Sequence, residues 1–295
     1  MARMEFFRRF SRSLLRQNSG GRRRSCPPAL LLSTYGFLGI IVVLPLVAIS
    51  VRALDVGIVQ LLGNFKNPHM LHALKLTLMV SFAVMIINVF TGTLVAWVLV
   101  RYDFPGKKIM NALIDVPFAI PTVVTGLMLL SVYGPEWVLA DLLKKADIQV
   151  VFARPGIVLA LLIVTLPFVI RSVQPVLMAA DPRAEEAAAT LGASRLKTFL
   201  RVILPPILPS ILMGAALSFS RALGEFGSVI VVAGNIPMKT QLAPVFIYAE
   251  IESGNMESAL ALSVVLLALS MVLLVVFKLF ERLAGAAPEK AGGMT

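Results

Sequence analysis

Residues 181–205 have the sequence DPRAEEAAATLGASRLKTFLRVILP, and this pattern predicts two short helices joined by a tight turn. Asp181 belongs to a residue type that caps helix N-termini, and the alanine-rich run that follows favours helix. Gly192 can end the first helix, because glycine readily adopts a left-handed conformation. Ser194 is a suitable cap for a second helix, which Pro205 is expected to close. We therefore expect a helical elbow here.

The predicted elbow has a surface of small alanine side chains and an apolar edge that contains Leu196, Phe199 and Leu200. A surface of this kind fits a groove on another protein. With Arg195 and Lys197 among the apolar residues, it also suits an amphipathic helix that lies on a lipid surface. Physical chemistry alone leaves both interpretations open.

Long apolar stretches flank the elbow, and the composition of the chain shows why. Of the 295 residues, 58% are hydrophobic and 15% are charged, and the mean hydropathy is +0.88. Water-soluble domains carry about 25% charged residues, so much of this chain needs a lipid solvent. A transmembrane helix needs about 20 mostly apolar residues. The sequence thus predicts an all-α polytopic membrane protein with about six spans: 29–51, 73–100, 109–132, 157–177, 206–232 and 259–277.

Prolines interrupt several of these stretches. Each proline lacks a backbone N–H, and the carbonyl that it frees must be satisfied by a neighbouring helix or a wet cavity. Proline is common in membrane helices in general, but its clustering here favours a protein that forms a pathway. The prolines in or beside the predicted spans are Pro117, Pro121, Pro167, Pro175, Pro205, Pro206 and Pro209.

The positions of the basic residues predict the orientation in the membrane. With the N-terminus inside, 18 of the 27 Lys and Arg residues lie on the inner side, six lie on the outer side, and Lys75, Arg171 and Arg221 fall within spans. Loops rich in Lys and Arg stay in the cytoplasm. We therefore expect both termini to be cytoplasmic. The predicted parts are a basic cytoplasmic tail over 1–28, a transmembrane domain over 29–280 and a cytoplasmic tail over 281–295.

The first 25 residues carry eight arginines and a single acid, Glu5. Such a segment favours a cytoplasmic tail that contacts anionic membrane lipid. Its richness in Arg and Ser is also typical of an organelle transit peptide. Nucleic-acid binding is the weakest alternative, because little aromatic interleaving accompanies the arginines. We therefore expect lipid, and no nucleic acid, as the partner of this segment.

Residue types that carry catalysis or bind metals are scarce. Cys26 is the only cysteine, and His69 and His72 are the only histidines, without a third ligand nearby in the sequence. Segments 192–198 (GASRLKT) and 234–240 (GNIPMKT) imitate a phosphate-binding loop but lack its second glycine. The ionisable residues within the spans are too scattered for an enzyme site. We expect no catalytic site, no metal and no cofactor.

The elbow also carries a motif that bears on its role. The pattern is Glu-Ala-Ala, three residues, Gly, nine residues and then Ile-x-Leu-Pro, and it resembles the coupling loop of ABC-type import permeases. Only Val202 departs from the pattern, and valine is a conservative replacement for isoleucine. The resemblance implies an ABC importer permease fold and a loop that docks into a dimer of separate ATPase subunits. The residues that carry it are Glu186, Ala187, Ala188, Gly192, Val202, Leu204 and Pro205.

Three further stretches resemble a narrower group, the sulfate/thiosulfate and molybdate permeases. They are 115–126 (DVPFAIPTVVTG), 166–177 (LPFVIRSVQPVL) and 221–241 (RALGEFGSVIVVAGNIPMKTQ). The similarity extends over about residues 30–280, which favours the sulfate permeases because molybdate permeases are usually shorter. The alternatives are a molybdate/tungstate permease of the same family and, less favoured, a self-contained anion carrier.

The resemblance further implies a non-catalytic subunit of the cell inner (plasma) membrane that forms the path for sulfate or thiosulfate. Its implied partners are the ATPase subunits, a second homologous permease subunit and an extracytoplasmic sulfate-binding protein. ATP hydrolysis then belongs to a separate subunit.

Arg221 and Glu225 are four residues apart within the fifth predicted span, so we expect them to share one helix face. Charged residues in a span face protein or a wet cavity, and they pair where they can. The two side chains can therefore form a structural ion pair, or Arg221 can lie near the path of a dianion. The sequence leaves both alternatives open.

Overall fold

The computed structural model describes residues 28–57, 63, 66–135 and 139–285. Every regular element among these residues is a helix, which confirms the predicted all-α class. Five helices are long and apolar enough to cross a membrane, and one further pair of helices is joined by a sharp bend. Most of the two predicted tails, 1–28 and 281–295, lies outside the described residues, and the last helix extends to Gly285 within the second tail.

The first predicted span is a helical stretch of α2 (Pro28–Leu38), the π-helical turn η1 (Gly39–Val43) and α3 (Leu44–Val56). Its apolar side chains are exposed almost throughout. An apolar helix that exposes its side chains needs lipid around it. The prediction of a span over 29–51 is confirmed, with a helix that continues to Val56.

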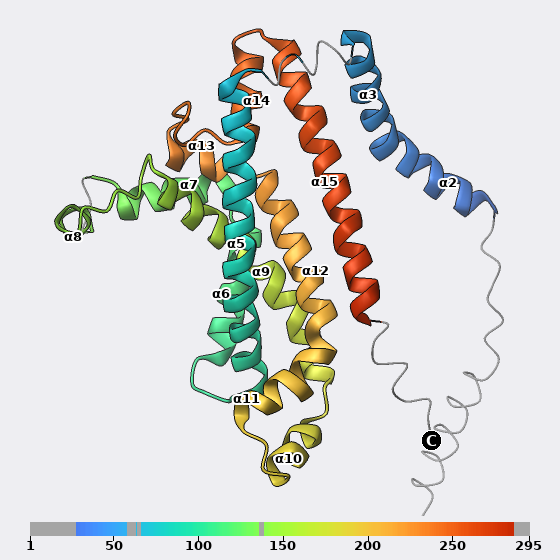
Figure 1. The fold of residues 1–295 in the computed structure, drawn as a ribbon, viewed down its shortest axis with the longest axis vertical. Helices are drawn as coiled ribbons and strands as arrows, with labels where there is room; N and C mark the ends of the chain where they lie inside the picture. Colours follow the sequence, from blue (N-terminus) through green and yellow to red (C-terminus); the bar gives the residue numbers. More distant parts are fainter. Residues whose placement is uncertain (1–27, 58–62, 64–65, 136–138, 286–295) are drawn as a thin grey trace, which may run out of the picture. The chain divides into compact units, whose positions relative to one another are not determined.

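Three long helices form the centre of the rest of the chain: α5 (Pro68–Arg101), α9 (Arg154–Ala179) and α12 (Leu204–Leu223). They pack against one another, and α15 (Met256–Gly285) lies along α12 (Figure 1). The second, fourth and sixth predicted spans are thereby confirmed. One part of the core between these helices is formed by the buried apolar residues Ala96, Val169, Ile170, Val173, Leu177, Ile203, Ile207 and Ile211.

Two glycines let the three central helices approach closely. A Cβ atom added at Gly92 of α5 or at Gly214 of α12 would lie 2.8 Å from an atom of Val169 of α9. Real Cβ atoms do not come so near, so any larger residue would push the helices apart. Small residues at helix contacts are characteristic of membrane bundles.

One buried amide also joins the three helices. Asn88 of α5 donates hydrogen bonds from Nδ2 to Thr165 Oγ1 of α9 (2.7 Å) and to Ser218 Oγ of α12 (3.2 Å). All three side chains are fully buried. We call Asn88, Thr165 and Ser218 the Asn88 hub.

The third predicted span is wrong as a single helix. The structure has two helices here, α6 (Lys107–Ala119) and α7 (Thr122–Tyr133), and the chain bends by 113° between them. The physical reason is Pro121, which has no N–H for the helical ladder and disfavours the helical conformation at Ile120. Ile120 accordingly has extended backbone angles, φ −83° and ψ 127°.

The bent pair nevertheless carries the chain from one end of the bundle to the other. The last residues of α5 and of α9 lie at the same end, beside α10 (Pro182–Thr190) (Figure 1). The start of α9 is 26 residues away, which is roughly 39 Å along a helix. The chain must cover this distance between α5 and α9, so the bent pair α6 and α7 forms one broken crossing, which the short α8 (Ala140–Lys145) follows.

The fifth predicted span begins earlier than expected. One continuous helical stretch runs from α11 (Arg195–Thr198) through the π-helical turn η2 (Phe199–Ile203) into α12. The expectation that Pro205 closes the elbow is therefore wrong, because Pro205 lies in the first turn of α12. The helix continues through this proline directly after the π-helical turn η2, in which the Leu204 N–H donates to the Phe199 carbonyl.

The same span also ends earlier than expected, at Leu223 rather than at residue 232. The chain leaves the helix at Gly224 and starts again as α13 (Gly227–Ala233). α14 (Ala243–Glu252) then packs against α5 at the end of the bundle away from α10, where the Ala243 N–H donates to Thr77 Oγ1 at 2.7 Å (Figure 1).

Candidate functional site

The 181–205 elbow forms largely as its residue types predict. The Asp181 carboxylate caps α10 by accepting a hydrogen bond from the Arg183 N–H at 3.0 Å. Gly192 has a φ of +76°, in the left-handed region. Ser194 Oγ accepts a hydrogen bond from the Lys197 N–H at 3.4 Å and so caps α11. These local features hold α10 and α11 apart as two arms with a fixed turn between them.

The surface of the elbow is unusually apolar for a segment outside the bundle. Helix α10 buries none of its residues. Leu191, at its end, is 87% exposed, and Leu196 and Leu200 on the second arm are exposed as well. Exposed apolar side chains grouped in this way mark a surface that another molecule covers.

The seven residues of the elbow motif are divided between this surface and the bundle. Glu186, Ala187, Gly192 and Pro205 are exposed, whereas Ala188, Val202 and Leu204 are half-buried. The first arm thus presents its carboxylate and small side chains outward. The second arm turns its apolar residues partly toward the bundle.

Arg221 and Glu225 form an ion pair, with 2.6 Å between Arg221 Nη1 and Glu225 Oε2. The expectation that they share one helix face is wrong, because α12 ends at Leu223 and Glu225 lies in the turn beyond it. The carboxylate is 1% exposed, whereas the guanidinium side chain is 36% exposed. The pair therefore joins a buried acid to a partly accessible base.

The Glu225 carboxylate has a second task at the start of α13. Its Oε1 accepts hydrogen bonds from the Ser228 N–H and the Ser228 Oγ–H, each at 2.9 Å. Both carboxylate oxygens are thus engaged. Arg221 uses only Nη1 for this pair, and its Nε and Nη2 donate no hydrogen bond to the part of the chain that the structure describes.

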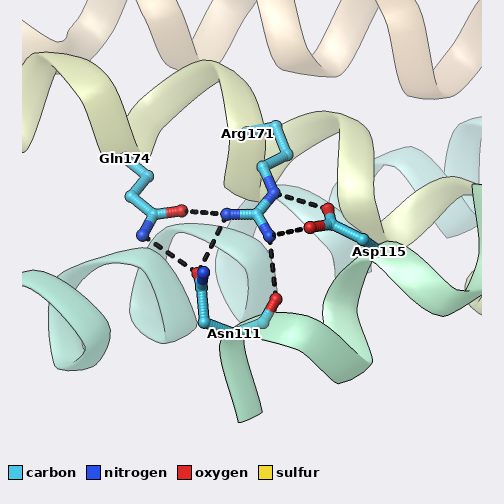
Figure 2. A network of polar contacts seen from close by, with 4 residues as sticks. All are labelled: Asn111, Asp115, Arg171 and Gln174. Atoms are coloured by element: carbon cyan, nitrogen blue, oxygen red, sulfur yellow. Dashed lines mark hydrogen bonds and ion pairs between the residues drawn. The ribbon is translucent and has the colours of Figure 1, made fainter. Parts of the chain in front are cut away.

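A second arginine within the membrane spans, Arg171 of α9, has a complete set of partners (Figure 2). Its Nε and Nη2 donate to the two oxygens of Asp115 at 2.7 and 2.6 Å. Nη1 donates to Asn111 Oδ1 at 2.9 Å and to Gln174 Oε1 at 2.6 Å, and Nη2 also reaches the Asn111 carbonyl at 2.8 Å. All five N–H groups are used, so this network links α6 to α9.

The Arg171 network was not predicted from the sequence, although signals for it exist. Arg171 falls within a predicted span, where a lone cation needs a partner. Asn111 and Asp115 are four residues apart, which puts them on one face of a helix. The pairing itself joins residues 56 positions apart and has no local pattern.

The chain is similar to known membrane components of transport systems. The family described as “Binding-protein-dependent transport system inner membrane component” matches residues 88–285. The chain is 44% identical to a probable sulfate transport system permease protein cysT of Chlorokybus atmophyticus, over 85% of this chain and 87% of that protein. It is 42% identical to the sulfate transport system permease protein CysT of Escherichia coli (strain K12), over 81% of this chain and 86% of that protein.

The fold also resembles solved structures. A chain of a bacterial alginate ABC transporter, crystallised in complex with an alginate pentasaccharide-bound periplasmic protein, superposes with a TM-score of 0.71. The match covers 84% of this chain and 91% of that chain at 18% sequence identity. At this identity the likeness concerns the fold alone.

Proposed function

Because the chain belongs to the family of inner membrane components of binding-protein-dependent transport systems, we propose that it is the permease subunit of an ATP-binding-cassette importer for sulfate or thiosulfate. The observation that carries this proposal is the identity of 42–44%, over most of the chain, with proteins named as sulfate transport system permeases. The broken helices also suit a path through the membrane.

Cells that lack this chain are expected to lose uptake of labelled sulfate and to require a reduced sulfur source such as cysteine. The test measures uptake of labelled sulfate and of labelled molybdate in the same cells, with and without a plasmid copy of the chain. Normal growth on limiting sulfate, together with failure of molybdenum-dependent reactions, would move the assignment to molybdate or tungstate.

The elbow over 181–205 is proposed to dock into the ATPase subunits, which hydrolyse ATP while this chain forms the path. Support comes from the exposed Leu191, Leu196 and Leu200, because an apolar surface outside the bundle needs a cover. The small side chains of Ala187 and Ala188 allow a close approach to a groove. The motif residues Glu186 and Gly192 are exposed beside them.

Two more partners are proposed. One is an extracytoplasmic sulfate-binding protein; the family description supports a partner of this kind, since it names transport that depends on a binding protein. The other is a second homologous permease subunit. It is supported by α6, which buries no residue and exposes Ile109, Leu113 and Phe118. Apolar side chains in this number need either lipid or a second permease against them.

Both termini are proposed to be cytoplasmic in the inner membrane. Six crossings return the chain to the side on which it began, and the Lys and Arg count favours the inside for that side. After replacement of Cys26, single cysteines placed at Ser19 and at Gly292 are expected to react in intact cells only with membrane-permeant thiol reagents. Labelling of either by an impermeant reagent would overturn this orientation.

Arg221 is proposed to lie on the path of the anion. Support comes from its contrast with Arg171, whose five N–H groups are all occupied. Arg221 keeps two nitrogens without a partner in the described residues and is partly accessible. A guanidinium with free donors binds tetrahedral oxyanions in bidentate fashion. Glu225 neutralises part of its charge, which favours passage of the anion over tight binding.

A further inference from the structure

Two side chains at the end of α5 contact both arms of the elbow. Arg101, the last residue of α5, pairs with Glu185 of α10, with 2.6 Å between Nη2 and Oε1. Trp97 packs against Phe199 of η2, with 5.2 Å between the ring centroids. Trp97 and Arg101 are four residues apart and so lie on one face of α5. We call these four residues the α5 clamp.

Packing alone does not hold the first arm of the elbow. Helix α10 buries no residue. A cavity of about 210 Å³ lies beside it, lined by Arg101 and Glu185, by Val202 and Ile203 of η2 and by Pro206 at the start of α12. The Arg101–Glu185 pair bridges this loosely packed region, and its two side chains are only 15% and 25% exposed. Partial burial reduces screening, which makes the pair stronger than an ion pair in open water.

The clamp differs from the Arg171 network in a way that suits a moving contact. The Arg171 guanidinium uses every donor, which is typical of a fixed link. In the clamp, Arg101 Nε and Trp97 Nε1 are buried without a hydrogen-bond partner among the described residues. A buried donor without a partner costs free energy. The clamp thus joins α5 to the elbow with donors left unused, unlike the fully hydrogen-bonded Arg171 network.

Helix α5 is well placed to carry a displacement through the membrane. It is tied to α9 and α12 at the Asn88 hub. Near its other end, Thr77 accepts a hydrogen bond from the first residue of α14. From Arg101 to Thr77 the helix spans 24 residues, roughly 36 Å. A push on one end of a straight helix therefore reaches the opposite side of the bundle.

We propose that the α5 clamp transmits movement of the docked elbow to α5, so that Arg101 and Glu185 are positioning residues for the coupling of ATP hydrolysis to transport. This inference rests on the proposed function. The elbow is connected to α9 and α12 through the chain itself. The clamp adds a third route for its movement, through side-chain contacts with α5. Neither residue belongs to the elbow motif that the sequence singles out.

The test uses the assembled importer in proteoliposomes, with its ATPase, partner permease and binding protein, and measures sulfate uptake and ATP hydrolysis in the same vesicles. Arg101→Glu and Glu185→Arg are each expected to lower the sulfate carried per ATP hydrolysed on the order of tenfold. The double variant Arg101→Glu/Glu185→Arg is expected to restore most of that ratio. A merely structural role would change the yield of assembled importer and leave the ratio as it is.

A nearby ion pair provides a matched control. Lys107 Nζ and Asp103 Oδ1 are 2.8 Å apart at the same end of the bundle. The hydrogen bond and charge of Lys107 hold the pKa of Asp103 below its ordinary value, so this carboxylate is ionised at neutral pH. Among the described residues, no hydrogen bond or ion pair joins these two side chains to the elbow. Lys107→Glu replaces a positive charge by a negative one, as Arg101→Glu does. It is expected to leave the sulfate carried per ATP hydrolysed unchanged.

Either of two results would overturn the clamp. One is an unchanged ratio in assembled importers that carry Arg101→Glu and Glu185→Arg separately. The other is a double variant that assembles normally but stays uncoupled. If Arg101→Glu does not assemble, Glu185→Gln replaces it, because glutamine keeps the volume and removes the charge, and an unchanged ratio again counts against the clamp. Failure of the wild-type vesicles to take up sulfate would contradict the proposed function instead.

Discussion

Replacing Gly192 by valine is expected to lower sulfate uptake on the order of tenfold while the chain still reaches the membrane. The turn holds Gly192 at a φ of +76°, and a left-handed conformation costs an L-residue roughly 1–2 kcal/mol. A Cβ atom there would meet no atom within 4 Å, so the cost arises from the backbone alone. The native turn would then be populated roughly tenfold less, since 1.4 kcal/mol corresponds to a factor of ten.

The turn matters because it sets the angle between the two arms of the elbow. The Ala193 N–H donates to the Ala188 carbonyl at 3.0 Å, and the Gly192 N–H donates to the Ala189 carbonyl at 3.0 Å. Both bonds need the left-handed residue between the arms. Without them α10 would present Leu191 and its alanines at another angle, and the ATPase would dock poorly.

The measurement is uptake of labelled sulfate, normalised to the amount of chain in the membrane, together with co-purification of the ATPase. Gly192→Asn is the matched control, because asparagine tolerates the left-handed region several times better than other residues. It is expected to keep most of the uptake. Wild-type uptake and co-purification by the valine variant would show that this turn has no role in coupling.

Neutralising both Arg221 and Glu225 is expected to lower uptake by roughly ten- to a hundredfold, the equivalent of one lost charge-assisted hydrogen bond to the anion. The double variant Arg221→Gln/Glu225→Gln is preferable to removal of Arg221 alone. Without Arg221, the Glu225 carboxylate, 1% exposed, would be a buried charge without a positive partner, and the chain would be destabilised for that reason. The glutamine amide oxygen can still accept from Ser228 and cap α13.

Uptake, normalised to the amount of assembled importer, separates the two roles of the pair. If the pair is only structural, the doubly neutral chain folds and transports, since neither charge is left unpaired. If Arg221 serves the anion, the chain assembles but hardly transports. Glu225→Gln alone keeps the cation and is expected to retain transport. Exchanging the two charges is a poorer experiment, because an arginine at position 225 cannot accept the hydrogen bonds from Ser228.

The spans and the caps of this fold could be predicted from the sequence because their causes are local. A run of apolar residues needs lipid wherever it lies in the chain, which is why four predicted spans agree with the structure and a fifth agrees apart from its bounds. Asp181, Gly192 and Ser194 act through backbone groups one to four residues away. Short-range chemistry of this kind is legible in a single sequence.

The predictions from sequence fail where the end of a helix depends on more than the nearest residue types. Pro117 stays within α6, whereas Pro121 follows its end and precedes α7, and the residue type alone does not distinguish the two prolines. Arg221 and Glu225 do pair, but the spacing argument that predicted this applied to a helix that has already ended. The two side chains still meet because the turn after Gly224 keeps Glu225 close to Arg221, while the Glu225 carboxylate caps α13.

The Asn88 hub restricts the kinds of motion that this bundle can make. Sliding one helix along another by a single turn would shift it about 5.4 Å, far beyond hydrogen-bonding distance. The Asn88 amide would then lose Thr165 or Ser218 in a place where water cannot replace them, at a cost of several kcal/mol. This cost disfavours sliding of α5, α9 and α12 past one another. The hub therefore favours a change of access from one side of the membrane to the other in which these three helices tilt together.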